Sequence, residues 1–65
     1  MTENEWQIQN REKGIEAHEK MILIFQMQMD RSKSVFERSS LAGNIDYHHR
    51  MIKKLTDELN TLKQS

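Results

Sequence analysis

The chain has no cysteine and no proline, and it has two glycines in 65 residues. The absence of cysteine excludes a disulfide framework, a thiol nucleophile and a zinc site built from cysteines. Proline and glycine are the residues that most often mark turns, so their scarcity predicts long helices. The remainder is rich in Glu, Gln, Lys, Arg, Met and Leu, which lose little side-chain freedom in a helix.

The chain has neither an excess of charge of one sign nor a long apolar run. Ten Lys and Arg balance ten Asp and Glu, which argues against a strongly basic nucleic-acid-binding arm. The longest apolar run, residues 21–25, is far shorter than the roughly 20 residues of a membrane-spanning helix. The acidic opening residues do not resemble a secretory leader. We therefore expect one small cytoplasmic domain, residues 1–65, with no membrane association, and too short for a barrel or dinucleotide-binding enzyme.

The first helix is predicted over residues 3–38. Thr2 and Glu5 have the spacing of a capping box at its start. Gly14 leaves two interpretations open: a helical glycine costing about 1 kcal/mol relative to alanine, or a C-cap that breaks the helix. A seven-residue apolar repeat passes Gly14 without a shift and favours a continuous helix. Its members are Ile8, Ile15, Ile22, Met29 and Phe36.

A loop is predicted over residues 39–44, because Gly43 can adopt a left-handed conformation and Asn44 is a good N-cap. A second helix is then expected over residues 45–63. Its apolar positions alternate at spacings of three and four, which is typical of a packed helix seam. The sequence thus predicts an all-α fold, a two-helix antiparallel hairpin with coiled-coil-like packing that dimerises into a helical bundle. The seam of the second helix comprises Ile45, His48, Ile52, Leu55, Leu59 and Leu62.

One stretch of the first helix is apolar all the way round, which normally means burial on every side. Within residues 21–29, Leu23, Ile24 and Met27 point away from the seam. Two compatible interpretations follow. Two hairpins could pack into a four-helix bundle, or a different protein could dock on Leu23, Ile24, Met27 and Trp6. The predicted core and dimer seam comprises Ile22, Phe25, Met29, Phe36, Ile45, Ile52, Leu55, Leu59 and Leu62.

Motifs for catalysis are missing: there is no phosphate loop, nucleophile elbow or His-Glu-x-x-His pattern. The sequence therefore predicts no enzyme activity, no cofactor and no metal site. His18 and His48 both occupy seam positions, so we expect that they can meet across the hairpin. Protonation there would loosen the packing.

A basic cluster on the second helix supports an alternative. Arg50, Lys53 and Lys54 are neighbours on one side of a helix, and dimerisation would double the cluster. Asp46 and Asp57 lie beside it and weaken its positive charge. The alternative function is a dimeric helical bundle that regulates through nucleic-acid binding.

In length and two-helix layout the chain is similar to two kinds of small helical hairpin. One is the dimeric plasmid copy-number regulator of the Rop type, and the other is the YscE-like co-chaperone of type III secretion. The resemblance is architectural, so it implies no functional residue. We expect a non-enzymatic protein–protein interaction module. It would be a self-associating hairpin that acts as an adaptor, a co-chaperone, or a regulator or inhibitor of a larger protein.

Overall fold

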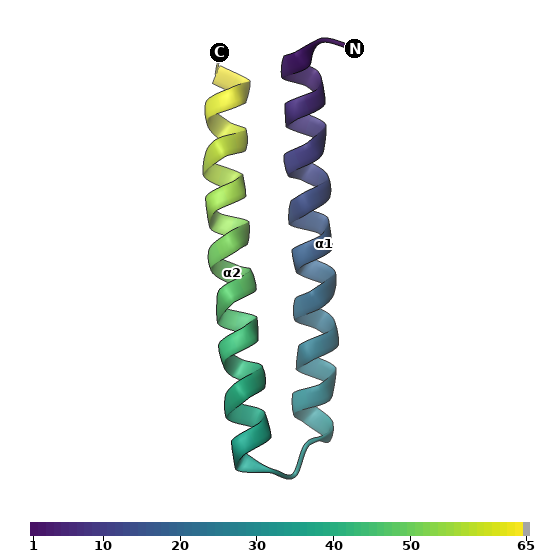
Figure 1. Cartoon of the computed structure of the whole chain (residues 1–65), viewed down its shortest axis with the longest axis vertical. Helices are drawn as coiled ribbons and strands as arrows, with labels where there is room; N and C mark the ends of the chain where they lie inside the picture. Colours follow the sequence, from purple (N-terminus) through teal and green to yellow (C-terminus); the bar gives the residue numbers. More distant parts are fainter. Residues whose placement is uncertain (65) are drawn as a thin grey trace.

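The computed structural model describes residues 1–64, which form two α-helices and no strand. Helix α1 spans Glu3–Arg31 and helix α2 spans Val35–Gln64. They lie side by side and antiparallel, joined by a short turn, so the start of α1 lies beside the end of α2 (Figure 1). The hairpin measures 48 × 17 × 11 Å. The predicted all-α hairpin is therefore confirmed. Neither helix within residues 1–64 has an apolar stretch long enough to cross a membrane.

Helix α1 begins where the capping-box spacing predicts. The Thr2 hydroxyl accepts a hydrogen bond from the Glu5 backbone N–H at 3.1 Å. The helix then runs through Gly14 without a break, so the continuous interpretation is correct. A Cβ atom added at Gly14 would lie 3.1 Å from Leu55 Cδ1 of α2. The glycine therefore lets the two helices approach closely at this level.

The turn is not where the sequence analysis places it. The predicted first helix to residue 38, loop over 39–44 and second helix from residue 45 are wrong: α1 ends at Arg31, and residues 39–44 are helical. No residue in 1–64 has a positive φ, so Gly43 has the negative φ of its helical neighbours rather than a left-handed conformation. Its side of α2 is open, with nothing within 4 Å of an added Cβ.

Serines make the real turn, residues 32–34. The Ser34 hydroxyl accepts from the Glu37 backbone N–H at 3.3 Å, and the Ser34 carbonyl accepts from the Arg38 N–H at 3.0 Å. The Ser32 hydroxyl accepts from the Ser34 N–H at 3.3 Å. Ser34 is thus the N-cap of α2, and Ser34 and Glu37 repeat the spacing of Thr2 and Glu5.

Moving the turn changes the role of two apolar residues. Phe36, predicted as a core residue, is 88% exposed, because it belongs to the first turn of α2 and points away from α1. Leu41, predicted to lie in the loop, is buried. It precedes Ile45 by four residues and so extends the seam of α2 toward the turn.

The core is a single row of side chains between the helices. Within residues 1–64 the buried hydrophobic side chains are those of Ile22, Leu41 and Leu59. Two helices shield each other along one side only, so the other seam positions keep part of their surface in solvent. The half-buried apolar members are Ile8, Ile15, Phe25, Met29, Ile45, Met51, Ile52, Leu55 and Leu62.

Candidate interaction surfaces

A cluster of rings joins the two helices halfway along the hairpin. His18 Nδ1 and His48 Nδ1 are 2.6 Å apart, so the expected meeting of these residues is confirmed. One imidazole must donate and the other accept, because two donors cannot share this contact. Phe25 stacks on His48 with ring centroids 5.7 Å apart, and Tyr47 meets His48 edge-on at 5.1 Å. Within residues 1–64 no group of three or more His, Asp or Glu side chains could hold a metal ion.

Polar contacts also cross the seam toward the chain ends. Arg11 of α1 lies 3.8 Å from the Glu58 carboxylate of α2, while its Nε is buried without a hydrogen-bond partner. The Asn4 amide donates to the Leu62 carbonyl at 3.5 Å. Sequence reasoning missed the Arg11–Glu58 pair, although a cation at a seam position is itself a signal that an acidic partner lies opposite.

Three apolar side chains of α1 stand in solvent, away from the seam. Leu23, Ile24 and Met27, here called the outer patch, are 60%, 45% and 54% exposed. Trp6 is also exposed. It precedes Ile24 by five helical turns, so both residues lie on the same side of α1. The residues predicted to bind a partner are therefore accessible.

The turn carries a second exposed apolar pair. Val35 and Phe36 open helix α2, and both project almost fully into solvent. Sequence reasoning missed this feature because it placed Phe36 in the seam. The capping-box spacing of Ser34 and Glu37 would have revealed it, since it starts α2 at residue 35 and frees both side chains.

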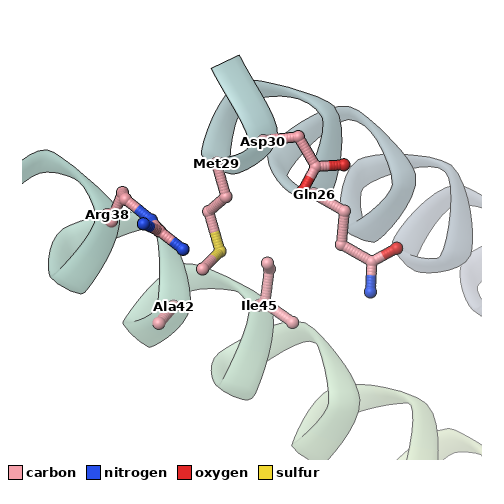
Figure 2. Close-up of a pocket in the computed structure, with 6 residues that line it drawn as sticks. All are labelled: Gln26, Met29, Asp30, Arg38, Ala42 and Ile45. Atoms are coloured by element: carbon pink, nitrogen blue, oxygen red, sulfur yellow. The ribbon is translucent and has the colours of Figure 1, made fainter. Parts of the chain in front are cut away.

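Two hollows open on one face between the helices, here called the groove face. The larger, of about 410 Å³, lies near the turn, where Met29 of α1 reaches toward Ala42 and Ile45 of α2 (Figure 2). Its remaining lining residues are Gln26, Asp30 and Arg38. The smaller, of about 270 Å³, is lined by Glu19, Ile22, Leu23, His49 and Ile52.

The candidate nucleic-acid cluster lies on the outer side of α2. Arg50, Lys53 and Lys54 are all exposed. The guanidinium of Arg50 is 3.1 Å from the Asp46 carboxylate, one helical turn earlier. This ion pair offsets one of the three positive charges within the helix itself.

Comparison with known proteins gives no match among protein-family models, curated proteins or solved structures. The surfaces of the hairpin are therefore the basis for assigning a function.

Proposed function

We propose that this chain works through protein–protein contact, as a self-associating helical hairpin that serves as an adaptor, co-chaperone or regulator of a larger protein. One observation carries the proposal. Within residues 1–64, three hydrophobic side chains are buried while nine large ones are exposed. A hairpin of this size is marginally stable by itself, and covering exposed apolar surface with another chain would add the missing burial.

The distribution of the exposed apolar side chains supports contact with a protein surface. The outer patch combines leucine, isoleucine and methionine on adjacent turns of α1. Clustered apolar residues mark interaction sites more reliably than isolated ones. Methionine is unbranched and polarisable, so it adapts to the shape of a partner.

Nucleic-acid binding has less support. Phosphate recognition depends on unpaired cations, and Arg50 is already paired with Asp46 at 3.1 Å. The formal charge of the whole chain is zero. A gel shift that weakens steeply with added salt would favour this alternative, because apolar docking depends little on salt.

Sedimentation equilibrium of the full chain tests the proposal. We expect the wild type to self-associate, and Leu23→Asp/Met27→Asp to raise the dissociation constant by at least about tenfold, since a charge at Leu23 enters an apolar contact. The matched control is Asn10→Asp/Ser40→Asp, which makes the same change at two exposed polar positions. Circular dichroism checks that all three proteins are equally helical. The proposal makes two claims, and both must fail to contradict it. The first fails if a helical wild type stays monomeric at every concentration. The second fails if a pull-down with Leu23→Asp/Met27→Asp recovers the same proteins as one with the wild type.

A further inference from the structure

The two edges of the groove face carry opposite charge. On α1 the hollows are lined by Glu19, Leu23, Gln26 and Asp30, which fall on one side of the helix. Steps of three, four or seven residues extend this edge toward the N-terminus. Its charged members are Glu5, Glu12, Glu16, Glu19 and Asp30, of which Glu16 is already paired with Lys20, one helical turn later, at 3.4 Å.

The facing edge on α2 is basic. Its cations are Arg38, which lines the larger hollow, and Lys53 and Lys63, which the same spacings add. His49, which is neutral in the formal charge count, lines the smaller hollow. Two carboxylates lie beside this edge: Asp46, which is paired with Arg50 at 3.1 Å, and Asp57, one helical turn after Lys53. An acidic edge and a basic edge on one face make that face complementary to a copy of itself.

Building on the proposed self-association, we propose that a second copy of this chain covers the groove face, with α1 of each copy lying on α2 of the other. A two-fold axis parallel to the helices produces this arrangement. It puts the turns of both copies at the same end. The acidic edge of each copy then meets the basic edge of the other.

The positions of the residues along the hairpin axis, here called their levels, support this pairing. His18 is level with His48, and Asn4 is level with Leu62. An axis parallel to the helices preserves these levels between copies. Asp30 of one copy therefore comes beside Arg38 of the second, and Lys53 comes between two carboxylates. The remaining charge pairs follow in the same way: Lys53 with Glu12 and Glu16, and Lys63 with Glu5. His49 comes beside Glu16 and Glu19, to which its ring N–H can donate.

An apolar contact accompanies the charges. Leu23 stands at the edge of the groove face and is exposed in the single hairpin. At its level, the second copy presents the hollow that is lined by Ala42, Ile45 and Met29. An exposed leucine opposite a hollow lined by apolar side chains is the type of contact that anchors an interface.

The opposite orientation is disfavoured by charge. A two-fold axis perpendicular to the helices would lay α1 of one copy on α1 of the other. The carboxylates of Glu12, Glu16 and Glu19 would then face the same three carboxylates of the second chain. Like charges in an interface select against such a pairing. The favoured dimer leaves Trp6, Ile24 and Met27 outside the groove face, where a different protein could still bind.

Charge reversal tests the inference. One variant makes the α1 edge basic (Glu12→Lys/Glu16→Lys/Glu19→Lys), and a second makes the α2 edge acidic (Arg38→Glu/His49→Glu/Lys53→Glu). At low salt, we expect each variant alone to raise the dissociation constant of the dimer by at least about tenfold, because attractive pairs become repulsive. An equimolar mixture of the two should form a heterodimer near wild-type affinity, since every edge then meets its opposite.

The mixture separates contacts between copies from contacts within one chain. Each variant keeps a mismatch across its own groove, so recovery in the mixture can arise only between chains. The matched control reverses three exposed cations off the groove face, Lys13→Glu/Arg31→Glu/Lys54→Glu, and should dimerise like the wild type. If a reversal variant loses helicity, Glu12→Gln/Glu16→Gln/Glu19→Gln or Arg38→Gln/His49→Gln/Lys53→Gln replaces it. Either should remove the salt dependence of the dimer.

The possible outcomes distinguish this inference from the proposed function. A wild type that dimerises, with no response to either reversal, overturns the inference and leaves self-association intact. A mixture that fails to recover shows that the edges act within one chain, and it also overturns the inference. A monomeric wild type contradicts self-association itself, and then the groove face is free for a different protein.

Discussion

The half of the hairpin near the chain ends and the half near the turn differ in their contacts between the helices and in how much apolar surface they expose. Near the ends, side chains connect the helices closely: Arg11 lies 3.8 Å from Glu58, and Gly14 leaves a gap that Leu55 fills. Near the turn, Ile22 and Leu41 are buried in the seam, but a hollow of about 410 Å³ opens beside it on the groove face. The exposed apolar residues also concentrate there: Leu23, Ile24, Met27, Val35 and Phe36.

Chain connectivity explains the difference. The turn of residues 32–34 holds the neighbouring helix ends together covalently, so a contact between the helices there costs little loop-closure entropy. A contact near the chain ends, such as that of Asn4 with Leu62, closes a loop through almost the whole chain and needs close packing to persist. The turn half can therefore keep apolar surface free for a partner.

The test with the largest expected effect replaces one buried leucine in each half. Leu59 and Leu41 are both 8% exposed, so each Leu→Ala change removes a similar buried volume. We expect a loss of about 2–4 kcal/mol of unfolding free energy, with the larger loss for Leu59→Ala, because no covalent link supports the terminal half. Urea denaturation followed by circular dichroism measures both. Ser40→Ala, at an exposed position, serves as the control. Equal losses for the two leucines would remove the distinction between the halves.

The second test acts at the boundary between the halves, where His18 and His48 share a hydrogen bond at 2.6 Å. When both imidazoles are protonated, each ring nitrogen is a donor and both rings are positive, so this contact is lost. Conditions that protonate both rings should therefore destabilise the hairpin. Thermal melts at pH 8 and pH 5 measure the change.

Two variants identify the source of that pH dependence. His18→Leu/His48→Leu removes both titrating groups from the seam and should make the melting temperature nearly independent of pH. His49→Gln alters an exposed histidine outside the pair and should leave the pH dependence in place. The same pH dependence in all three proteins would exclude the paired imidazoles as its cause.

Much of the seam could be predicted because the apolar periodicity within a helix does not depend on where the turn lies. The spacing of Ile45, Ile52 and Leu59 depends only on residues within α2. The turn lies at residues 32–34 and not at 39–44 because the capping-box pair of Ser34 and Glu37 outweighs Gly43. Helical interiors tolerate an exposed glycine at a modest cost, whereas a serine cap removes an unsatisfied N–H group.

The groove face could not be predicted, for a related reason. Its hollows and its charge pairing depend on which residues of α1 and α2 are level, and the position of the turn sets those levels. Phe36 illustrates the effect: it continues the seven-residue repeat of α1, yet it belongs to α2 and is exposed. Periodicity within a helix carries no information about where that helix ends.

The third test compares the N-caps of the two helices. The Ser34 hydroxyl accepts from the Glu37 N–H at 3.3 Å, and the Thr2 hydroxyl accepts from the Glu5 N–H at 3.1 Å. Ser34→Ala should cost about 1 kcal/mol, because the turn couples both helices. Thr2→Ala should cost less, because a terminal turn can fray without unfolding the hairpin. Thermal melts measure the total loss, and amide exchange shows whether protection is lost locally or throughout. A larger effect at Thr2 would contradict the coupling role of the turn.

The smallest test uses the two glycines, since both are helical and only one is crowded. Gly43→Ala places a methyl group in open space and should stabilise the hairpin by about 0.5–1 kcal/mol through helix propensity. Gly14→Ala gains the same propensity, but its Cβ would lie 3.1 Å from Leu55 Cδ1, so the leucine must move and much of the gain is lost. Because propensity is common to both changes, the difference between their melting temperatures reports the packing of the terminal half alone. An equal gain at both positions would show that Leu55 moves freely and that Gly14 is not needed for close packing in this half.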